Sequence, residues 1–472
     1  MSFSGLAFVF HFLPLFLIAY YVFPKRFRNI ILLLGSLIFY AIGNPYYLLL
    51  LVISVLINFL LADRIYLART KEKENESAKS FAKAWLILAL VYDVGMLFVF
   101  KYMGFVLSNV EKLSGKEMPV FEWALPLGIS FYTFQMISFV VDIYRKNYEK
   151  RIHLFHFAVY AVMFPQIASG PITRYGDVRE RIEHPASVTA GMLEKGAVYF
   201  VSGLGYKVLL ADKITSLWND IRTVGPLGID VATAWLGAWG YSMQIYFDFF
   251  GYSLMAIGVA MMLGFRLPDN FDDPYCSKSM TEFWRRWHMT LGKWFRDYIY
   301  IPLGGNRCSY PKMIFNIFMV WLLTGIWHGA NWNFIIWGLM LFVVMFTEKT
   351  WTGKWLEKSK VIGHLYMLVL IPVFWAIFGI SDMTELSHFM LRLINVPIEG
   401  MVVSGFNQFM AMVSIYWWML LIGALFCTPY PMRLIRKFYK NFIVKIILFA
   451  IFWYCVYQMA NSGNNPFIYF SF

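Results

Sequence analysis

The feature that most constrains this chain is a succession of apolar runs over nearly its whole length. A membrane-spanning helix needs about 20 mostly apolar residues, and about eleven to thirteen runs approach that length. Several are short enough to be re-entrant, and such segments persist at membrane depth only inside protein or beside a cavity. The runs cover residues 5–23, 29–43, 46–62, 84–100, 120–143, 152–168, 196–211, 232–263, 312–328, 332–347, 361–380, 403–426 and 442–460. The sequence therefore predicts an all-α polytopic membrane protein with a single domain over residues 1–472.

Composition supports this fold class and excludes several others. Of the 472 residues, 59% are hydrophobic and only 15% are charged, whereas soluble domains are about 25% charged. The net charge of +13 is dispersed between the apolar runs, which argues against a nucleic-acid-binding protein. The four cysteines show no CxxC spacing and no cluster with histidine, so no metal site is predicted.

The basic loops predict the orientation of the chain. Lysine and arginine concentrate in residues 25–28, 63–83, 145–151 and 433–445. The positive-inside rule places these loops in the cytoplasm and the N-terminus outside. We therefore expect a multi-pass protein of the cytoplasmic (inner) membrane, surrounded by lipid.

Residues 264–312 differ from their surroundings because they are polar but rich in tryptophan and arginine. From Ser279 to Tyr300 the apolar positions recur at helical spacing, which predicts one amphipathic helix on the cytoplasmic side. Such a helix lies in the membrane interface, with its basic side toward headgroups or an anionic ligand. Its tryptophans then act as an interfacial anchor, and His288 lies at the edge of their face. The cations on the opposite arc are Arg285, Arg286, Lys293 and Arg296.

Residues 312–347 predict a short helical hairpin that carries His328. Both flanks are basic, and the helix from Met313 to Trp327 has 15 residues. That is about 22 Å of helix, less than the roughly 30 Å of the hydrocarbon core. His328 should therefore lie within the membrane thickness, where an ionisable side chain is a functional candidate. Its neutral imidazole is able to accept a proton from a hydroxyl, and we expect Gly325 and Gly329 to let a substrate approach closely.

An ordered set of short motifs resembles the membrane-bound O-acyltransferase (MBOAT) family. The resemblance is greatest to its bacterial polysaccharide-acetylating branch, which includes the membrane subunit of alginate O-acetyltransferase. The motifs occur in family order over nearly the whole chain. They are Leu125–Gln135, Phe164–Gln166 with Gly170–Ile172, Gln244–Phe249 with Gly251–Tyr252, Gly264–Phe271, Phe283–His288, Tyr300–Asn306, Trp327–Gly329 and Asn465–Phe470.

The resemblance implies a fold of many helices around a central tunnel. It also implies an acyltransferase with His328 as the essential catalytic histidine and His288 as a second functional polar group. Other branches of the family often carry Asn or Asp at the position of His288. Asn331, Asn333 or His288 is a candidate donor to the oxyanion of the reaction. The cations Arg285, Arg286, Lys293 and Arg296 are candidates for binding the acyl donor.

The same resemblance implies the reaction. Cytosolic acetyl-CoA is the donor substrate, with no bound cofactor, and the acetyl group crosses the membrane to a hydroxyl of a polysaccharide or cell-wall glycan. The acceptor is often reached through a secreted or membrane-anchored partner with a Ser-His-Asp site. Two alternatives keep the fold: D-alanyl transfer to teichoic acid, and longer-chain acyl transfer to lipid or protein. A transporter without chemistry is a remote alternative, and the chain shows no internal repeat that would support it.

Overall fold

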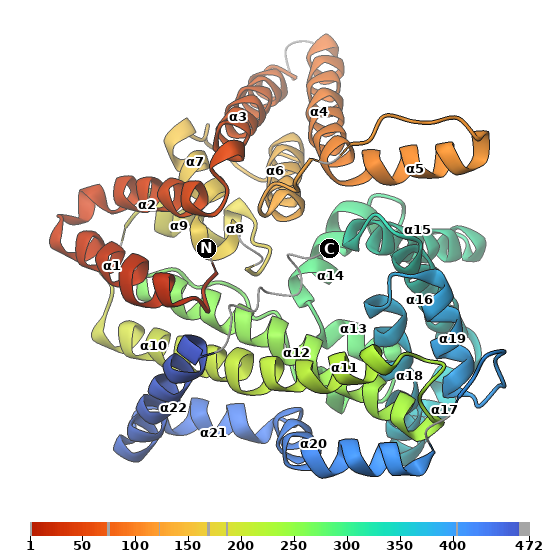
Figure 1. Cartoon of the computed structure of the whole chain (residues 1–472). Coiled ribbons are helices and arrows are strands. Elements are labelled where there is room, and N and C mark those ends of the chain that lie inside the picture. Colours follow the sequence, from red (N-terminus) through yellow and green to blue (C-terminus); the bar gives the residue numbers. More distant parts are fainter. Residues whose placement is uncertain are drawn as a thin grey trace. The chain divides into compact units, whose positions relative to one another are not determined.

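The computed structural model describes residues 2–72, 76–121, 123–167, 170–185, 187–402 and 405–461. Within these ranges every regular element is a helix, which confirms the predicted all-α fold class (Figure 1). The closing motif Asn465–Phe470 lies outside the described residues. In the described part of the chain, eight helical segments are long and apolar enough to cross a membrane. They are Lys25–Gly43, Pro45–Thr70, Ser77–Ser114, Val231–Met262, Trp332–Leu356, Lys360–Gly379, Phe406–Phe426 and Phe442–Asn461.

The chain divides into two compact units. One comprises Met1–Phe200 with Ala256–Pro268, and the other comprises Val201–Met255 with Asp269–Phe472. The long helix α12 (Val231–Met262) contributes residues to both units. Both histidines singled out from the sequence belong to the second unit.

In the first unit, α3 (Leu48–Thr70) and α4 (Glu76–Leu97) pack side by side and against α6 (Ile129–Tyr144) (Figure 1). A buried hydrogen bond of 2.7 Å from Asn58 Nδ2 to Asp93 Oδ1 joins α3 to α4. Such polar contacts hold membrane helices together. The other α-helices wholly in this unit are α1 (Leu13–Val22), α2 (Arg28–Gly43), α5 (Met103–Ser114), α7 (Leu154–Val162), α8 (Phe164–Ile167) and α9 (Tyr175–Glu183).

Two of the predicted runs are shorter as helices than the sequence suggested. The run 120–143 is helical only from Ile129, because Gly128 takes a left-handed conformation with φ 70°. The run 152–168 is interrupted at Met163, between α7 and α8. In a continuous helix the Pro165 ring would clash with a carbonyl in the preceding turn and one helical hydrogen bond would be lost, whereas Pro165 is well tolerated in the first turn of α8.

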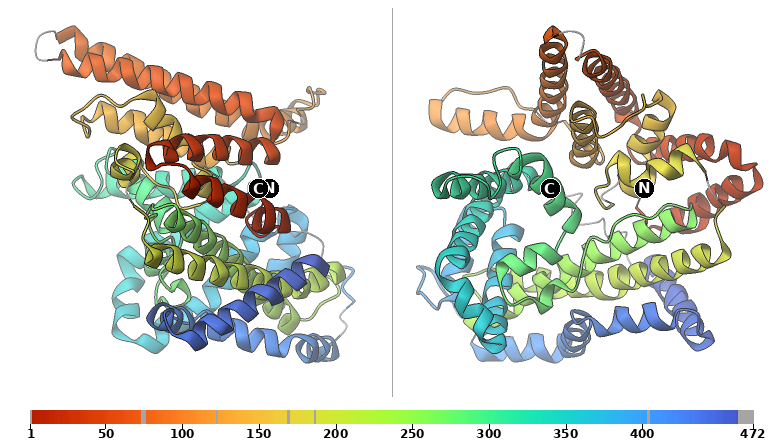
Figure 2. Two further views of the ribbon diagram at one scale, coloured as in Figure 1. Left: turned by 90° about the vertical axis from the view of Figure 1, so that its left-hand side faces the viewer. Right: turned by 180° about the vertical axis from the view of Figure 1, so that it is seen from behind.

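The second unit contains most of the remaining helices. The α-helices α20 (Phe406–Phe426), α21 (Tyr430–Phe438) and α22 (Phe442–Asn461) follow one another in a row, drawn in blue in Figure 2. The hairpin predicted from residues 312–347 is formed by α15 (Tyr310–His328) and α16 (Trp332–Thr347). The other elements include η5 (Tyr206–Ala211), α11 (Asp212–Val224), α13 (Met280–Arg286), α14 (Met289–Phe295), η7 (Arg296–Tyr300), η8 (Glu348–Thr352), α17 (Gly353–Lys358), α18 (Lys360–Gly379) and α19 (Met383–Leu393). The helix α10 (Ala190–Gly205) runs from the first unit into the second.

A buried ionic cluster joins η5, α11 and α12 within this unit. Lys207 Nζ lies 2.7 Å from Asp212 Oδ1 and 2.7 Å from Asp248 Oδ1. The side chains of Lys207 and Asp248 are only 5% and 1% exposed. Gly203 and Gly251 bring the two backbones together beside this cluster, because a Cβ on Gly203 would lie 2.4 Å from the Gly251 carbonyl oxygen. The Lys207–Asp248 pair is therefore buried between closely packed helices, whereas the side chain of Asp212 is 22% exposed.

Candidate active site around two histidines

Glycines allow α15 and α16 of the hairpin to pack closely against each other. A Cβ on Gly338 would lie 2.5 Å from the carbonyl oxygen of Trp321, and one on Gly325 would lie 2.4 Å from that of Phe334. A Cβ on Gly329 would meet the ring of Phe334 at 2.2 Å. These glycines therefore allow the two helices to approach each other. We expected Gly325 and Gly329 to let a substrate approach closely, but Phe334 of α16 occupies the Cβ position of both glycines.

Replacing Gly338 by alanine is expected to lower the free energy of unfolding by about 1–3 kcal/mol, since the new methyl group meets backbone that is unable to move aside. Gly95 in α4 is the matched control, because nothing lies within 4 Å of its Cβ position. There, alanine should stabilise the helix by up to about 1 kcal/mol. Thermal unfolding of the purified protein in detergent compares the two variants. Equal melting temperatures would show that the hairpin does not depend on this close approach.

His328 ends α15 and is enclosed by aromatic rings. It is 5% exposed. Its ring centroid lies 5.0 Å from that of Trp327, 5.1 Å from that of Trp337 and 5.1 Å from that of Phe378. The surrounding rings come from α15, α16 and α18. The predicted burial of His328 in the hairpin is therefore confirmed.

The predicted single amphipathic helix from Ser279 to Tyr300 is broken at His288. The chain forms α13, leaves the helix at Trp287 and His288, and resumes as α14 and η7. His288 has φ 44° and ψ 51°, the left-handed region. Histidine visits that region more readily than most residues other than glycine, although at a cost of about 1–3 kcal/mol. The expectation of one continuous helix was wrong.

The tryptophan face of residues 279–300 packs against other helices of the protein. Trp287 is 1% exposed and its ring centroid lies 4.6 Å from that of Trp375 in α18. Trp284 lies 5.3 Å from Trp337 and 5.2 Å from Trp321, both on the hairpin. The face therefore fixes α13 against α15, α16 and α18. The interpretation as a tryptophan anchor in the lipid interface was wrong, because protein covers these rings.

This packing brings His288 and His328 to the same aromatic side chain. The His288 ring centroid lies 6.2 Å from that of Trp327, which also contacts His328. On its other side His288 makes an edge contact of 4.7 Å with Phe249 in α12. His288 is 1% exposed, and burial lowers its pKa to about 3. The imidazole of His288 is therefore neutral over the physiological pH range.

A cavity of about 980 Å³ adjoins this centre. His288, Trp284 and Thr324 line it, and Thr324 lies one helical turn before His328 on α15. Its volume falls at the upper end of the range for small-molecule sites, about 300–1,000 Å³. The cations that line the cavity are Lys278, Arg285, Arg296, Lys349 and Lys354.

One buried carboxylate fixes the wall of the cavity. Glu348, in η8 at the end of α16, is 5% exposed. Its Oε1 accepts the N–H of Met280 at 2.6 Å, and its Oε2 accepts the N–H and hydroxyl of Thr281 at 2.8 and 2.6 Å. These bonds satisfy the free N–H groups at the start of α13. The hairpin of α15 and α16 is therefore connected directly to the start of α13.

The four predicted donor-binding cations have different surroundings. Arg285 and Arg296 line the cavity. Arg296 also contacts Asp297 at 2.8 Å, whereas Arg285 has no ion-pair partner within the described ranges. Lys293 is exposed and does not line the cavity.

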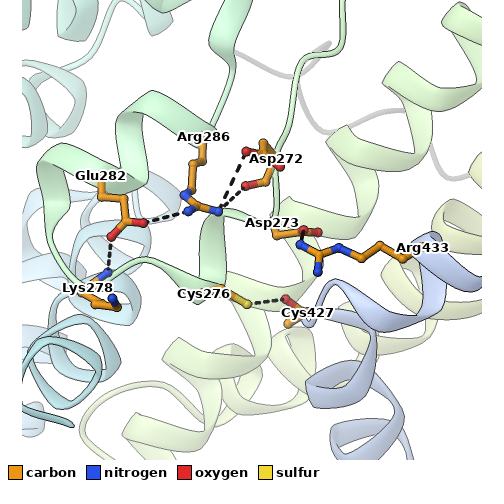
Figure 3. A network of polar contacts seen from close by, with 8 residues as sticks. All are labelled: Asp272, Asp273, Cys276, Lys278, Glu282, Arg286, Cys427 and Arg433. Atoms are coloured by element: carbon orange, nitrogen blue, oxygen red, sulfur yellow. Dashed lines mark hydrogen bonds and ion pairs between the residues drawn. The ribbon is translucent and has the colours of Figure 1, made fainter. Parts of the chain in front are cut away.

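Arg286 belongs to a separate network (Figure 3). It lies 2.9 Å from Glu282 and 3.9 Å from Asp272, and it donates to the Asp272 carbonyl at 3.2 Å. In the same network Arg433 of α21 lies 3.5 Å from Asp273 (Figure 3). Arg286 therefore holds the loop before α13. The same loop packs beside α21, which overlaps the predicted cytoplasmic loop of residues 433–445.

The two asparagines of the hairpin differ as well. Asn333 is fully buried, and its Nδ2 donates to the carbonyl oxygens of Ile377 and Phe378 at 3.2 and 2.9 Å. Both amide hydrogens are thus used to hold α16 against α18, which leaves none for an oxyanion. Asn331 is half-buried at the N-cap of α16 and its side chain makes no capping bond.

Sequence reasoning missed three parts of this unit: Asn270, Glu348 and the pair Lys207–Asp248. For the pair a signal existed, since both residues stand inside apolar runs, where ionisable side chains are candidates for function. Asn270 lies in one of the quoted motifs, but its spacing gave no sign of its partner. Glu348 follows an apolar run among cations, a pattern that also fits a solvated loop.

Comparisons with known proteins agree on one family. The sequence profile of the membrane-bound O-acyltransferase family matches residues 48–382. The chain is 39% identical to the probable alginate O-acetylase AlgI of Pseudomonas aeruginosa, over 80% of this chain and 69% of that protein. It is 31% identical to the peptidoglycan O-acetyltransferase of Helicobacter pylori, over 81% of this chain and 78% of that protein. A shorter match, 31% identical over 50% of this chain and 61% of the other, is to the teichoic acid D-alanyltransferase of Bacillus subtilis.

Proposed function

Because the chain belongs to the membrane-bound O-acyltransferase family, we propose that it transfers the acetyl group of cytosolic acetyl-CoA to a hydroxyl outside the membrane. The final product is an O-acetylated exopolysaccharide or cell-wall glycan. The observation that carries this proposal is the pair of buried histidines on Trp327, beside a cavity lined by cations.

His328 is the proposed general base. It takes the proton of the acceptor hydroxyl, and the oxygen attacks the thioester carbonyl. The C–S bond then breaks, and the thiolate of CoA leaves and takes up a proton. Asn331 is the proposed oxyanion donor among the three candidates. Asn333 has both amide hydrogens committed to α18.

The cavity is the proposed donor site. Acetyl-CoA carries several phosphate charges, and cations at the mouth of a cavity attract such a ligand. The lysines and arginines that line the cavity support a cytoplasmic mouth, because basic residues concentrate on the cytoplasmic side of membrane proteins. The acceptor then arrives from the opposite side of an inner-membrane protein, either as the glycan or as a partner with a Ser-His-Asp site.

The direct test uses membranes that contain the protein, acetyl-CoA labelled in the acetyl group, and glycan acceptors with and without the partner. We expect label in an ester that mild base releases. If D-alanyl-carrier protein or a long-chain acyl-CoA gave product while acetyl-CoA gave none, an alternative cargo would replace this proposal. Movement of an unmodified substrate without thioester cleavage would instead indicate a transporter.

Replacing Arg285 by alanine is expected to raise the KM for acetyl-CoA by about five- to thirtyfold, since one charge-assisted contact to phosphate contributes about 1–2 kcal/mol. The effect should shrink at high salt, because the cation is exposed. Arg286→Ala is the matched control, since Arg286 holds the loop before α13 and should affect melting temperature more than KM. Steady-state kinetics at two ionic strengths, with melting curves, separate the two residues. A larger KM effect at Arg286 would contradict the assignment.

A further inference from the structure

His288 is held by a side chain 18 positions earlier in the chain. Its Nδ1 lies 2.9 Å from Oδ1 of Asn270. The same Oδ1 accepts the hydroxyl of Thr290 at 2.9 Å, and Nδ2 of Asn270 donates to Ser253 Oγ at 3.1 Å. Met289 N–H donates to the Asn270 carbonyl at 2.9 Å. Asn270 thus braces the left-handed turn at His288 through both backbone and side chain.

This network determines which ring nitrogen carries the proton. The Thr290 N–H also points to Oδ1 of Asn270, at 3.4 Å, so this atom is an acceptor. An acceptor opposite Nδ1 requires Nδ1 to be the donor. A neutral imidazole has one N–H, so Nε2 must carry the lone pair.

Nε2 is the ring nitrogen of His288 that is available to a ligand. It is buried and has no hydrogen-bond partner within the described residues. His288 lines the cavity, and its Nδ1 edge is occupied by Asn270. A buried polar atom without a partner costs free energy, as does the left-handed backbone. Both features indicate a position shaped for a bound molecule.

We propose that Asn270 is a positioning residue that fixes His288 as the Nδ1–H tautomer, so that Nε2 accepts a hydrogen bond from an N–H or O–H group in the cavity. This inference rests on the proposed function only for the identity of the ligand. It also changes the role of His288 in that function: a neutral His288 in this tautomer accepts and does not donate, so it is not the oxyanion donor.

The first test measures the tautomer without any reaction. The purified protein is labelled with ¹⁵N-histidine, and the His288 signals are identified by their absence in His288→Asn. Ring-nitrogen chemical shifts are expected to show Nδ1–H in the wild type and a mixture of tautomers in Asn270→Ala. An Nε2–H signal in the wild type, or an unchanged Nδ1–H signal in Asn270→Ala, would overturn the proposal. This test stays valid even if acetyl-CoA is not the donor.

The second test is kinetic. Asn270→Ala should lower kcat by about 10²-fold, as misplacement of a reacting group does. Asn270→Asp keeps the acceptor oxygen, so it should retain transfer near neutral pH. Its carboxylate stabilises imidazolium and raises the pKa of His288, which moves the acid limb of the pH–rate profile to higher pH. Thr290→Val is the control, since it removes a neighbouring bond to Asn270 and should cost no more than about fivefold. An equal loss in Asn270→Ala and Asn270→Asp, with no shift of the profile, would overturn the positioning role.

Discussion

Acetyl transfer is expected to fall by about 10²–10⁴-fold when His328 is replaced by alanine, the range that a general base contributes. His328 ends the helix at the closed end of the hairpin, and three aromatic side chains fix its ring. No second imidazole replaces it, because the lone pair of His288 is oriented by Asn270. Membranes with matched amounts of protein and labelled acetyl-CoA provide the measurement.

Two further variants show whether the loss of transfer comes from the chemistry of His328 or from altered packing. His328→Gln keeps most of the side-chain volume, so an equal loss of activity would come from chemistry and not from an empty space. His364→Ala on α18 is the matched control, because this histidine is exposed and its loss should leave transfer unchanged. Wild-type transfer by His328→Ala would refute the proposed mechanism.

A loss of stability of about 3–5 kcal/mol is expected for Lys207→Ala, because it leaves the buried carboxylate of Asp248 without its cation. Nζ of Lys207 lies 2.7 Å from Asp248, whose side chain is 1% exposed. The double variant Lys207→Met with Asp248→Leu removes both charges and should recover much of that loss. Unfolding in detergent, followed by a probe of helix content, measures these differences.

A surface ion pair supplies the control for this prediction. Arg222 lies 2.6 Å from Glu385, with side chains 36% and 23% exposed. Removing Arg222 should cost no more than about 1 kcal/mol, since water screens such a pair. If the double variant were less stable than Lys207→Ala alone, burial of the unpaired charge would not be the cause of the loss.

The sequence predicted the parts of the fold that depend on apolar periodicity and length. The all-α class, the hairpin of residues 312–347 and the burial of His328 all follow from runs of apolar residues interrupted by basic loops. The break at His288 was not predictable in this way. The apolar positions keep helical spacing across it, from Trp284 to Trp294, and periodicity contains no information about the φ of a single residue.

The contacts that complete the site also lie beyond sequence reasoning. Asn270 reaches His288 only because the loop before α13 folds back along the block, and Glu348 reaches Met280 from the far end of the hairpin. Neither pair has a characteristic spacing. The sequence also does not distinguish Arg285 from Arg286. They are neighbours in the chain, but Arg285 lines the cavity and Arg286 braces a loop.

The left-handed turn at position 288 also restricts how this position is able to change during evolution. A backbone with φ 44° admits glycine, asparagine, aspartate and histidine far more readily than branched or bulky residues. Of these four, the three with side chains are all capable of hydrogen bonding. The backbone conformation therefore restricts position 288 mainly to polar side chains, whichever substrate the protein uses. A change of substrate is compatible with only a few residues at this position.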